Sequence, residues 1–447
     1  MTKPSGPKMY LVSLGCPKNL IDSEILLGTM LKEGYTLTGH PEEADLLVVN
    51  SCSFVREAKE EAVETILRLA ALKRDAQRRH LVVVGCLPQR YGEQLLELIP
   101  EVDLFLGSGE IPRMAAHLRE LTSGGHRACH LGRADYLLDD EEPGVRPLRG
   151  PTAYVRIAEG CSNRCSYCAV PLIRGPLRSR TVDSIVTEVR RLTDAGIQEI
   201  VLVAQDTTAF GVDRSGRSEL PELLTALEQV QKLRWLRLMY VHPGGVDERF
   251  LEAISGSKRL CPYLDLPIQH ISPGILKAMN RRVGPQEIRS RISAIRKSMP
   301  GVHLRTTVIV GFPGETEEEF QALLEFLKET RFEWLGAFIY SKEEGTDAAR
   351  MKRQVTRTVA KRRLRELMRL QQGITSEALQ RWVGREIEVL VEGSRSKYLL
   401  GRAAFQAPEV DGVVRIKSGK APVGSFALVR VTVVKGYDLE GVLLSLN

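Results

Sequence analysis

Three cysteines stand close together in the segment EGCSNRCSYCAVP, which spans residues 159–171. Cys161, Cys165 and Cys168 follow the spacing C-x-x-x-C-x-x-C, directly after a run of residues typical of a strand. Three thiolates can ligate three irons of a [4Fe-4S] cluster and leave the fourth iron open. A structural zinc ion would take four protein ligands, and no fourth Cys or His lies close by in the sequence. The spacing therefore predicts an iron–sulfur cluster with one open position.

A second set of three cysteines is spread over the first hundred residues. Cys16, Cys52 and Cys86 follow the apolar runs YLVSLG, LLVVNS and LVVVG. If these runs are parallel strands of one sheet, their carboxyl ends meet at one crevice and bring the thiols together. Free cysteines are also common core residues, so three unrelated buried thiols are the alternative. We favour a second cluster, because each cysteine ends a strand beside Gly, Asn or Ser instead of lying within it.

Short apolar runs alternate with helical patterns, and they divide the chain into three regions. We expect these regions at 8–125, 147–375 and 376–447, with the polar stretch 139–151 as a linker. The first region should hold strands near 9–14, 45–50 and 81–84, and helices near 23–33, 55–73 and 89–98. This alternation predicts an α/β fold with an open parallel sheet and helices on its faces.

The second region repeats strand–helix units. Strands are expected near 154–157, 199–204, 235–241, 263–268, 304–310 and 335–340, with helices such as 182–195, 222–231 and 317–330 between them. Six units predict a partial (β/α)6 barrel of the TIM type, with its active residues at the carboxyl ends of the strands. The third region has short β-rich runs separated by glycines, which predict a small antiparallel β-barrel.

The central cysteine motif resembles that of the radical S-adenosylmethionine (SAM) superfamily. The resemblance rests on the cysteine spacing, on the aromatic Tyr167 before Cys168 and on the βα repeat. In such enzymes the amino and carboxylate groups of SAM chelate the open iron, and an electron from the cluster yields a 5′-deoxyadenosyl radical. The resemblance implies that the backbone at Tyr167 contacts adenine. It also implies SAM contacts from Gly311 and Gly314 in VIVGFPGET, and from Gln205.

Two cysteine sets in these three regions together resemble the methylthiotransferase family across nearly the whole chain. That family has an amino-terminal cluster domain, a radical SAM core and a carboxyl-terminal TRAM barrel. The resemblance implies two [4Fe-4S] clusters, held by Cys16/Cys52/Cys86 and by the central triad. One SAM would donate a methyl group to a sulfur at the first cluster. A second SAM would supply the radical that removes a substrate hydrogen, and the carbon radical would capture the methylthio group.

The family has branches with different substrates. The segments SLGCPKNLIDSE (13–24) and LDLPIQHISPGILKAMNR (264–281) resemble the branch that modifies an aspartate of the twelfth small-subunit ribosomal protein. The implied target is the β-carbon of that aspartate. The alternative is a tRNA adenosine methylthiotransferase, which shares every cluster residue. The resemblance also implies an electron donor such as flavodoxin or ferredoxin.

Composition agrees with a folded enzyme of two or three domains. The chain has 447 residues, a net charge of +7 and no apolar run long enough for a signal peptide or membrane span, so we expect a cytoplasmic protein without membrane contact. Its eight cysteines should then be reduced. Residues 350–369 carry nine Lys or Arg and one acid. This segment predicts either a solvated helix face or contact with RNA or the ribosome. If the protein is not an enzyme, the alternative function is that of an iron–sulfur redox sensor or an RNA-binding protein.

Several other reactive residues receive no chemical role. Cys129, near His126 and His130, is interpreted as structural, and Cys261 as core packing. His242 ends a strand and is given no acid–base role. Lys18 and Arg282 could face the substrate, but both are expected at the solvated surface. Beyond the cluster ligands, no catalytic residue is assigned.

Overall fold

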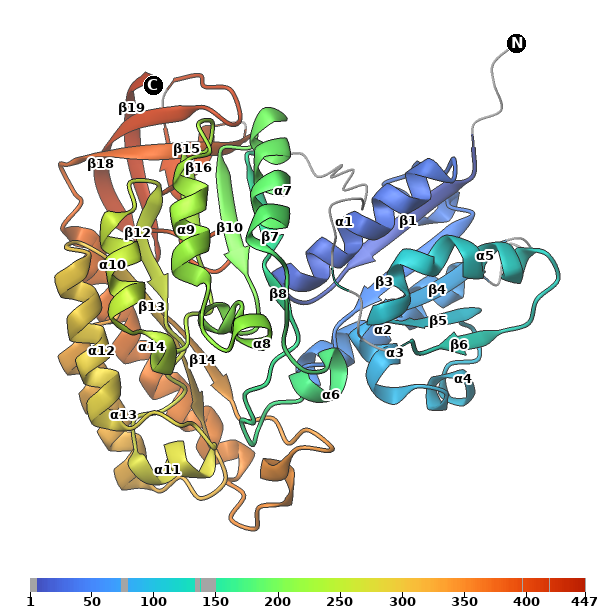
Figure 1. The fold of residues 1–447 in the computed structure, drawn as a ribbon, viewed down its shortest axis with the longest axis horizontal. Helices are drawn as coiled ribbons and strands as arrows, with labels where there is room; N and C mark the ends of the chain where they lie inside the picture. Colours follow the sequence, from blue (N-terminus) through green and yellow to red (C-terminus); the bar gives the residue numbers. More distant parts are fainter. Residues whose placement is uncertain are drawn as a thin grey trace.

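The computed structural model describes residues 6–73, 79–132, 137, 150–395, 397–417 and 419–446. Three bodies follow one another along the chain (Figure 1): an amino-terminal α/β domain, a central α/β core and a carboxyl-terminal barrel. The predicted linker at 139–151 lies outside the described residues except for its last two positions. No helix in these ranges combines the length and the apolar character that a membrane crossing requires.

The amino-terminal domain is built on a parallel sheet with the strand order β2-β1-β3-β4-β5-β6. Its strands are β1 (Lys8–Ser13), β2 (Thr36–Leu37), β3 (Leu46–Ser51), β4 (His80–Gly85), β5 (Leu104–Gly107) and β6 (Ala128–His130). Its helices are α1 (Pro17–Lys32), η1 (Pro41–Glu43), α2 (Arg56–Lys73), α3 (Cys86–Tyr91), α4 (Gln94–Leu98), η2 (Ser108–Arg113) and α5 (Met114–Thr122). The three predicted strands are β1, β3 and β4, which pair with one another at the centre of the sheet.

Alternate residues of this sheet face opposite helical layers. Val48 and Val82 pack with residues of α1 and α5, whereas Leu47 and Val83 pack with residues of α2 and α4. Both layers are needed because a parallel sheet buries both of its faces. The prediction of a single helix at 89–98 is wrong. The segment contains parts of two helices, α3 and α4, which are separated at Gly92 because its φ of 60° does not fit a right-handed α-helix.

The core sheet is also parallel, with the order β14-β13-β12-β11-β10-β7. Its strands are β7 (Thr152–Arg156), β10 (Glu199–Val203), β11 (Trp235–Leu238), β12 (Leu260–Asp265), β13 (His303–Val310) and β14 (Trp334–Ile339). A small separate pair consists of β8 (Ala158–Glu159) and β9 (Arg178–Ser179). The helices are α6 (Val170–Arg174), α7 (Val182–Asp194), η3 (Thr207–Ala209), α8 (Val212–Ser215), α9 (Leu220–Glu228), η4 (Pro243–Gly245), α10 (Glu248–Gly256), α11 (Pro273–Ala278), α12 (Pro285–Ser298), α13 (Glu317–Thr330), η5 (Asp347–Arg350) and α14 (Arg357–Gln380).

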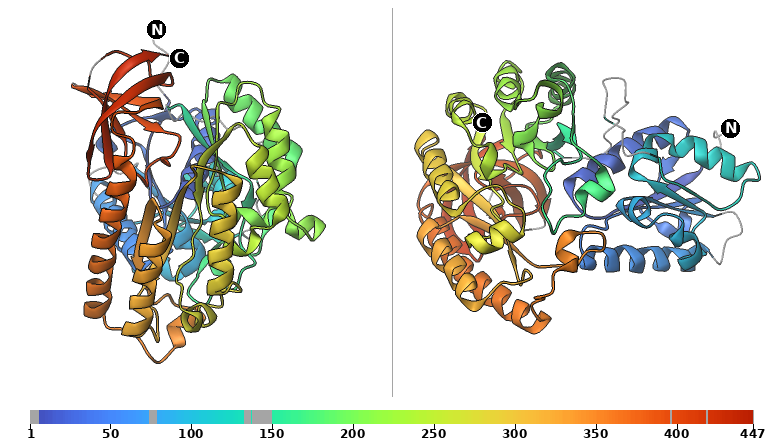
Figure 2. Two further views of the ribbon diagram at one scale, coloured as in Figure 1. Left: turned by 90° about the vertical axis from the view of Figure 1, so that its left-hand side faces the viewer. Right: turned by 60° about the horizontal axis from the view of Figure 1, so that its bottom comes forward.

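The core has the shape of an incomplete barrel, as the six strand–helix units predict. The helices form an arc around the outer side of the sheet (Figure 2). Ile200 and Leu202 of β10 pack toward these helices, and Val201 and Val203 face the concave side. Because side chains alternate between the two faces, each face of the sheet carries its own hydrophobic layer. The carboxyl ends of all strands therefore open on one end of the core, next to the loop of the central cysteines.

The carboxyl-terminal domain is a closed five-stranded barrel with the order β15-β16-β17-β19-β18. Its strands are β15 (Glu386–Arg395), β16 (Tyr398–Ala403), β17 (Val414–Ile416), β18 (Phe426–Lys435) and β19 (Asp438–Leu446). Four neighbouring pairs are antiparallel, as predicted, and the β17–β19 pair is parallel. That pair joins strands distant in sequence, which a pattern of local hairpins does not predict.

The barrel packs on the concave face of the core, at the amino ends of its strands. All three tryptophans lie at this contact: Trp235 packs edge-on against Phe426, Trp334 donates a hydrogen bond to the Phe405 carbonyl, and Trp382 stacks on Phe405. At its centre the Glu199 carboxylate pairs with Arg402 of the barrel and, at 2.7 Å, with Arg237 of the core. All three charged side chains are at most 2% exposed. Burial favours the neutral acid, but the two guanidinium groups outweigh it and lower the pKa of Glu199 to about 2.

Replacing Glu199 with glutamine is expected to detach the barrel from the core more easily. Two buried guanidinium groups would lose their counter-ion, which costs roughly 3–5 kcal/mol. Urea unfolding followed by tryptophan fluorescence measures this. Because the folded-state pKa is depressed, the ion pair contributes fully above the ordinary value near pH 4.3 and is lost as the pH falls toward 2, so the two proteins should converge there.

A matched control is Glu388→Gln, which removes another core–barrel ion pair. Arg234 and Glu388 lie 3.0 Å apart but are 46% and 34% exposed. Exposed pairs contribute less than about 1 kcal/mol, so this variant should unfold almost as the unmodified protein does. Equal effects from the two variants would contradict the central role of Glu199.

Candidate cluster and S-adenosylmethionine sites

The central cysteines occupy a loop between β8 and α6, at the carboxyl end of β7. The Cys161 N–H donates to the Gly175 carbonyl at 3.1 Å, and the Cys168 N–H donates to the Cys165 carbonyl at 3.1 Å. Ser166 attaches the loop to the end of α11, through its N–H to the Met279 carbonyl at 3.0 Å and its hydroxyl to the Ala278 carbonyl at 2.7 Å. These bonds hold the loop in a defined shape while all three thiols remain partly exposed.

Electrostatics at this loop oppose free thiolates and favour ligated ones. Burial, together with the neighbouring sulfurs, raises the pKa of Cys161 to about 11 and that of Cys168 to about 12. Without a metal these thiols are therefore protonated, and ligation displaces the protons. The Arg281 guanidinium lies 4.0 Å from the Cys165 sulfur and compensates negative charge there. Three thiols beside one cation fit a cluster ligated at three of its irons.

The amino-terminal cysteines follow three neighbouring strands. Cys16 comes after β1 and caps α1, Cys52 follows β3, and Cys86 is the first residue of α3 directly after β4. The helix amino terminus at Cys16 favours negative charge on a ligand. A Cβ on Gly15 would lie 2.7 Å from the Cys52 Cβ, so the first two loops touch.

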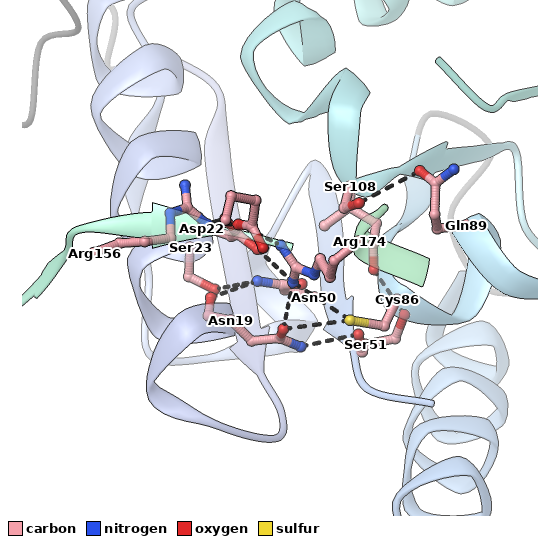
Figure 3. A network of polar contacts seen from close by, with 12 residues as sticks. Asn19, Asp22, Ser23, Asn50, Ser51, Cys86, Gln89, Ser108, Arg156 and Arg174 are labelled. Atoms are coloured by element: carbon pink, nitrogen blue, oxygen red, sulfur yellow. Dashed lines mark hydrogen bonds and ion pairs between the residues drawn. The ribbon is translucent and has the colours of Figure 1, made fainter. Parts of the chain in front are cut away.

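Asn19 of α1 joins the three strand ends (Figure 3). Its Nδ2 donates to the carbonyls of Leu14 and Ser51, both at 3.0 Å, and its Oδ1 lies 3.5 Å from the Cys86 sulfur. Burial, together with nearby Cys86 and Cys16, raises the pKa of Cys52 to about 12. The structure thus brings the three predicted thiols to one crevice, as parallel strand ends require.

Neither cysteine set is arranged for a single zinc ion. In the described part of the chain, three ligand atoms come within 4.8 Å of one another only at His117, Glu120 and His130. Ligands of one zinc lie closer than that, because each Zn–S bond is about 2.3 Å long. The irons of a cluster are separate, so their thiolates stand farther apart. The sets are also neighbours, since Cys86 packs against Ala169 and Ile173 directly after Cys168.

The residues expected to contact SAM lie around the carboxyl ends of the strands. Tyr167 packs beside Ile275, Phe312 and other apolar residues, and the Gln205 amide donates to Glu159 at 3.0 Å. Gly311 has a φ of 73°, and a Cβ there would lie 2.6 Å from the Ala360 Cβ. The glycine is thus required by packing against α14. Gly314 has a φ of 89° and no heavy atom within 4 Å of a built Cβ, so its backbone is open to a ligand.

Four buried polar residues near the cysteines were not singled out from the sequence. They are Asp22, Arg156, Glu159 and Arg174, and a fifth, Asp206, directly follows Gln205 in the predicted SAM-side position. Burial opposes ionisation of Glu159, but Arg174 and Arg156 lower its pKa to about 2. The Asp206 carboxylate accepts a hydrogen bond of 2.7 Å from the side-chain amide of Asn163, which stands between Cys161 and Cys165 in the sequence. Asp22 gave no sequence signal of its pairing, because its partner Arg156 lies 134 residues away along the chain.

The residues without an assigned role have structural positions. Cys261 is 2% exposed within the core, as predicted. The His242 Nδ1 accepts from the Gly244 N–H at 3.0 Å. Arg282 is exposed, as expected, but Lys18 is not a solvated surface residue. Its ammonium lies 3.7 Å from the centre of the Tyr240 ring and 3.3 Å from the Ala204 carbonyl, because α1 faces the core.

Cys129 belongs to no group of metal-ligating side chains among the described residues. Cys129 lies in β6, half-buried against one helical layer. The next residue, His130, stacks on His117 at 4.0 Å, and Glu110 lies 2.9 Å from the His117 ring. This arrangement agrees with a structural role for Cys129.

Comparisons with known proteins cover the same three bodies. The chain matches the uncharacterized protein family UPF0004 at residues 8–107, the Radical SAM superfamily at 155–327 and the TRAM domain at 383–444. Among solved structures, the radical SAM methyltransferase TsrM from Kitasatospora setae, with cobalamin and a [4Fe-4S] cluster bound, has a TM-score of 0.54 at 14% identity over 75% of this chain and 72% of its own. That likeness shows the fold.

Relatives with much higher identity span the whole chain. One, the ribosomal protein uS12 methylthiotransferase RimO of Geotalea uraniireducens, is 45% identical over 437 residues, which are 97% of this chain and 98% of its own. The protein of the same name from Geobacter sulfurreducens is 44% identical over 98% of this chain and 99% of its own. The aligned stretch includes both cysteine sets and most of the barrel. The chain therefore belongs to the RimO family of ribosomal protein uS12 methylthiotransferases.

Proposed function

We propose that this protein methylthiolates the β-carbon of an aspartate in ribosomal protein uS12. The observation that carries the proposal is the pair of adjacent three-cysteine sets in a chain of the RimO family. One set is expected to cleave SAM, and the other to hold the sulfur that is methylated and transferred. The cofactors are two [4Fe-4S] clusters and SAM, consistent with the family and with both donor sets.

The residues of the chain divide the work between the two sets. Cys161, Cys165 and Cys168 would ligate the cluster that cleaves SAM, and Cys16, Cys52 and Cys86 the other cluster. When bound, these groups supply the electron for SAM cleavage and the methylthio sulfur. Arg281 compensates charge at Cys165, and the hydrogen bonds of Ser166 hold the loop of the central cysteines in place.

SAM contacts are proposed at four further residues. The Tyr167 backbone would meet the adenine, and the open backbone at Gly314 and the Gln205 side chain would line the SAM site. Gly311 would act through the shape of the same turn, since its own Cβ position is filled by α14.

The reaction is tested with SAM that carries a deuterated methyl group. Reconstituted enzyme, sulfide, a reductant and uS12 should transfer one labelled methyl per modified protein and release 5′-deoxyadenosine in equal amount, because each product consumes two SAM molecules in different roles. Product without the label would contradict SAM as the source of the methyl group.

We also propose that a basic face on α14 contacts ribosomal RNA. Its exposed residues are Lys361, Arg365 and Arg369 of α14, together with Lys352 and Arg353 in the segment just before the helix, and no acidic side chain pairs with them among the residues that the structure describes. Neighbouring Arg362 and Arg363 are paired with Glu317. Because Ala360 of the same helix packs on Gly311, this face begins at the end of the core that holds the cysteines.

Replacing Lys361, Arg365 and Arg369 with glutamine should weaken binding to the small ribosomal subunit. Each lost phosphate contact reduces the slope of log affinity against log salt by about 1. Filter binding at several salt concentrations measures that slope. The control variant Arg190→Gln/Arg191→Gln neutralises two exposed arginines of α7 and should leave it unchanged. Equal slopes for all three proteins would contradict the contact.

The reaction also needs an external electron. We propose that a small donor such as flavodoxin or ferredoxin supplies it in the cytoplasm, where thiols stay reduced. Turnover with a purified reducing system of either kind, and none with the reductase alone, is the expected result.

A further inference from the structure

A buried cluster of four charged side chains lies between the two cysteine sets. This ionic bridge consists of Asp22, Arg156, Glu159 and Arg174, which are 2%, 1%, 4% and 5% exposed. Arg156 lies 2.7 Å from both Asp22 and Glu159, and Arg174 lies 2.8 Å from Asp22 and 3.4 Å from Glu159. Two cations thus alternate with two anions, and each charge has its counter-ions in a buried site.

The ionic bridge connects elements that carry the cysteines. Asp22 lies on α1, which begins after Cys16, and Glu159 lies just before Cys161. Arg174 ends α6, the helix that follows Cys168. Asp22 is therefore the contribution of the amino-terminal domain, and the other three residues belong to the core. Because buried ion pairs tolerate little change in geometry, the bridge sets the distance between the two loops.

Arg174 extends beyond the bridge to the amino-terminal set (Figure 3). Its Nη2 donates to the Asn19 side-chain carbonyl at 2.8 Å and lies 3.4 Å from the Cys86 sulfur. One guanidinium therefore contacts a predicted cluster ligand, the side chain that joins the strand ends, and the carboxylate of Asp22. A hydrogen bond and a positive charge at a ligating sulfur stabilise the reduced, more negative cluster.

We propose that Arg174 is a positioning residue that serves both cysteine sets. It holds Cys86 and α1 at a fixed place against the loop of the SAM-cleaving cluster, and it compensates negative charge on the amino-terminal cluster. The inference rests on the proposed function, because Cys86 must carry a cluster for this charge to act on. A fixed separation matters because the sulfur must meet the substrate radical in one geometry.

The test uses the full chain with Cys161, Cys165 and Cys168 replaced by alanine, so that only the amino-terminal cluster is loaded. Its midpoint potential is measured by redox titration followed by electron paramagnetic resonance. Arg174→Gln should shift the potential to a more negative value, because the positive charge is lost. Arg174→Lys keeps the charge without the planar fork and should stay nearer to the unmodified protein.

A matched control separates this effect from a loosened domain contact. Arg90 of α3 also crosses to the core, 2.6 Å from the buried Glu343 carboxylate, but it contacts no cysteine sulfur among the described residues. Arg90→Gln should speed amide hydrogen exchange at the contact between the domains and leave the potential unchanged. Arg174→Gln should change both exchange in α1 and the potential.

The outcomes distinguish this inference from the proposed function. No iron in the triple-alanine protein would contradict the amino-terminal cluster, and with it the proposed function. If iron is bound but Arg174→Gln has the same midpoint potential as Arg90→Gln, the role of Arg174 is overturned and the proposed function still stands. An equal negative shift in Arg174→Lys and Arg174→Gln would overturn the charge compensation. A shift confined to Arg174→Gln would support the inference.

Discussion

Replacing Cys161 with alanine is expected to abolish SAM cleavage, with a loss of at least about 100-fold. Loss of a partner outside the ligand shell already costs 10–100-fold in metal sites, and here a ligand itself is removed. The loop stays pinned through Ser166, so the change is confined to the cluster. Chromatography of 5′-deoxyadenosine formed with excess reductant measures the cleavage.

Cys129→Ala is the matched control for this variant. Cys129 is another half-buried free cysteine, but it lies in β6 and packs within the amino-terminal domain. We expect full cleavage from this variant. Unchanged cleavage in Cys161→Ala would remove the central triad from the proposed site.

Cys16→Ala should separate the two halves of the reaction. Iron should fall from about eight to about four atoms per chain, since one of two clusters is lost. The central loop makes no hydrogen bond to Cys16 among the described residues, so 5′-deoxyadenosine should still form while methylthiolated uS12 falls at least about 100-fold. Mass spectrometry of uS12 measures the product.

The expected SAM cleavage by Cys16→Ala depends on an intact contact between the amino-terminal domain and the core. Asp22 follows Cys16 on the same helix, so helix α1 must remain docked for cleavage to be normal. Hydrogen exchange of α1 in Cys16→Ala provides that control. Full product formation with four irons per chain would contradict a sulfur-transfer role for the amino-terminal set.

Much of the fold was predictable because its elements are locally encoded. The strands β3 and β4 have continuous apolar runs, as expected for strands buried on both faces, and β1 was recognisable from its apolar run although it is only partly buried. The short strand β5 was missed, because its apolar run has only three residues, at 104–106, and gives a weaker signal than the runs of β3 and β4. The break at Gly92 was missed because a glycine in a helical pattern is often tolerated.

The candidate site was predictable at the cysteines and not around them. The C-x-x-x-C-x-x-C spacing is local, and strand ends of a parallel sheet converge by rule. The partners of Arg174 are not local: Asn19 is 155 residues away along the chain. The SAM contact of Gly311 stays a prediction, and its packing against α14, which fills the Cβ position, could not be read from the motif.

The most direct test of the central claim offers two substrates separately to the reconstituted enzyme. Ribosomal protein uS12 and tRNA would each be incubated anaerobically with enzyme, SAM, sulfide and reductant, and analysed by mass spectrometry. We expect an addition of about 46 Da, for SCH2, on a uS12 aspartate and none on tRNA, because the cofactor supplies the group and the protein selects the target. The same addition on tRNA and not on uS12 would contradict the account.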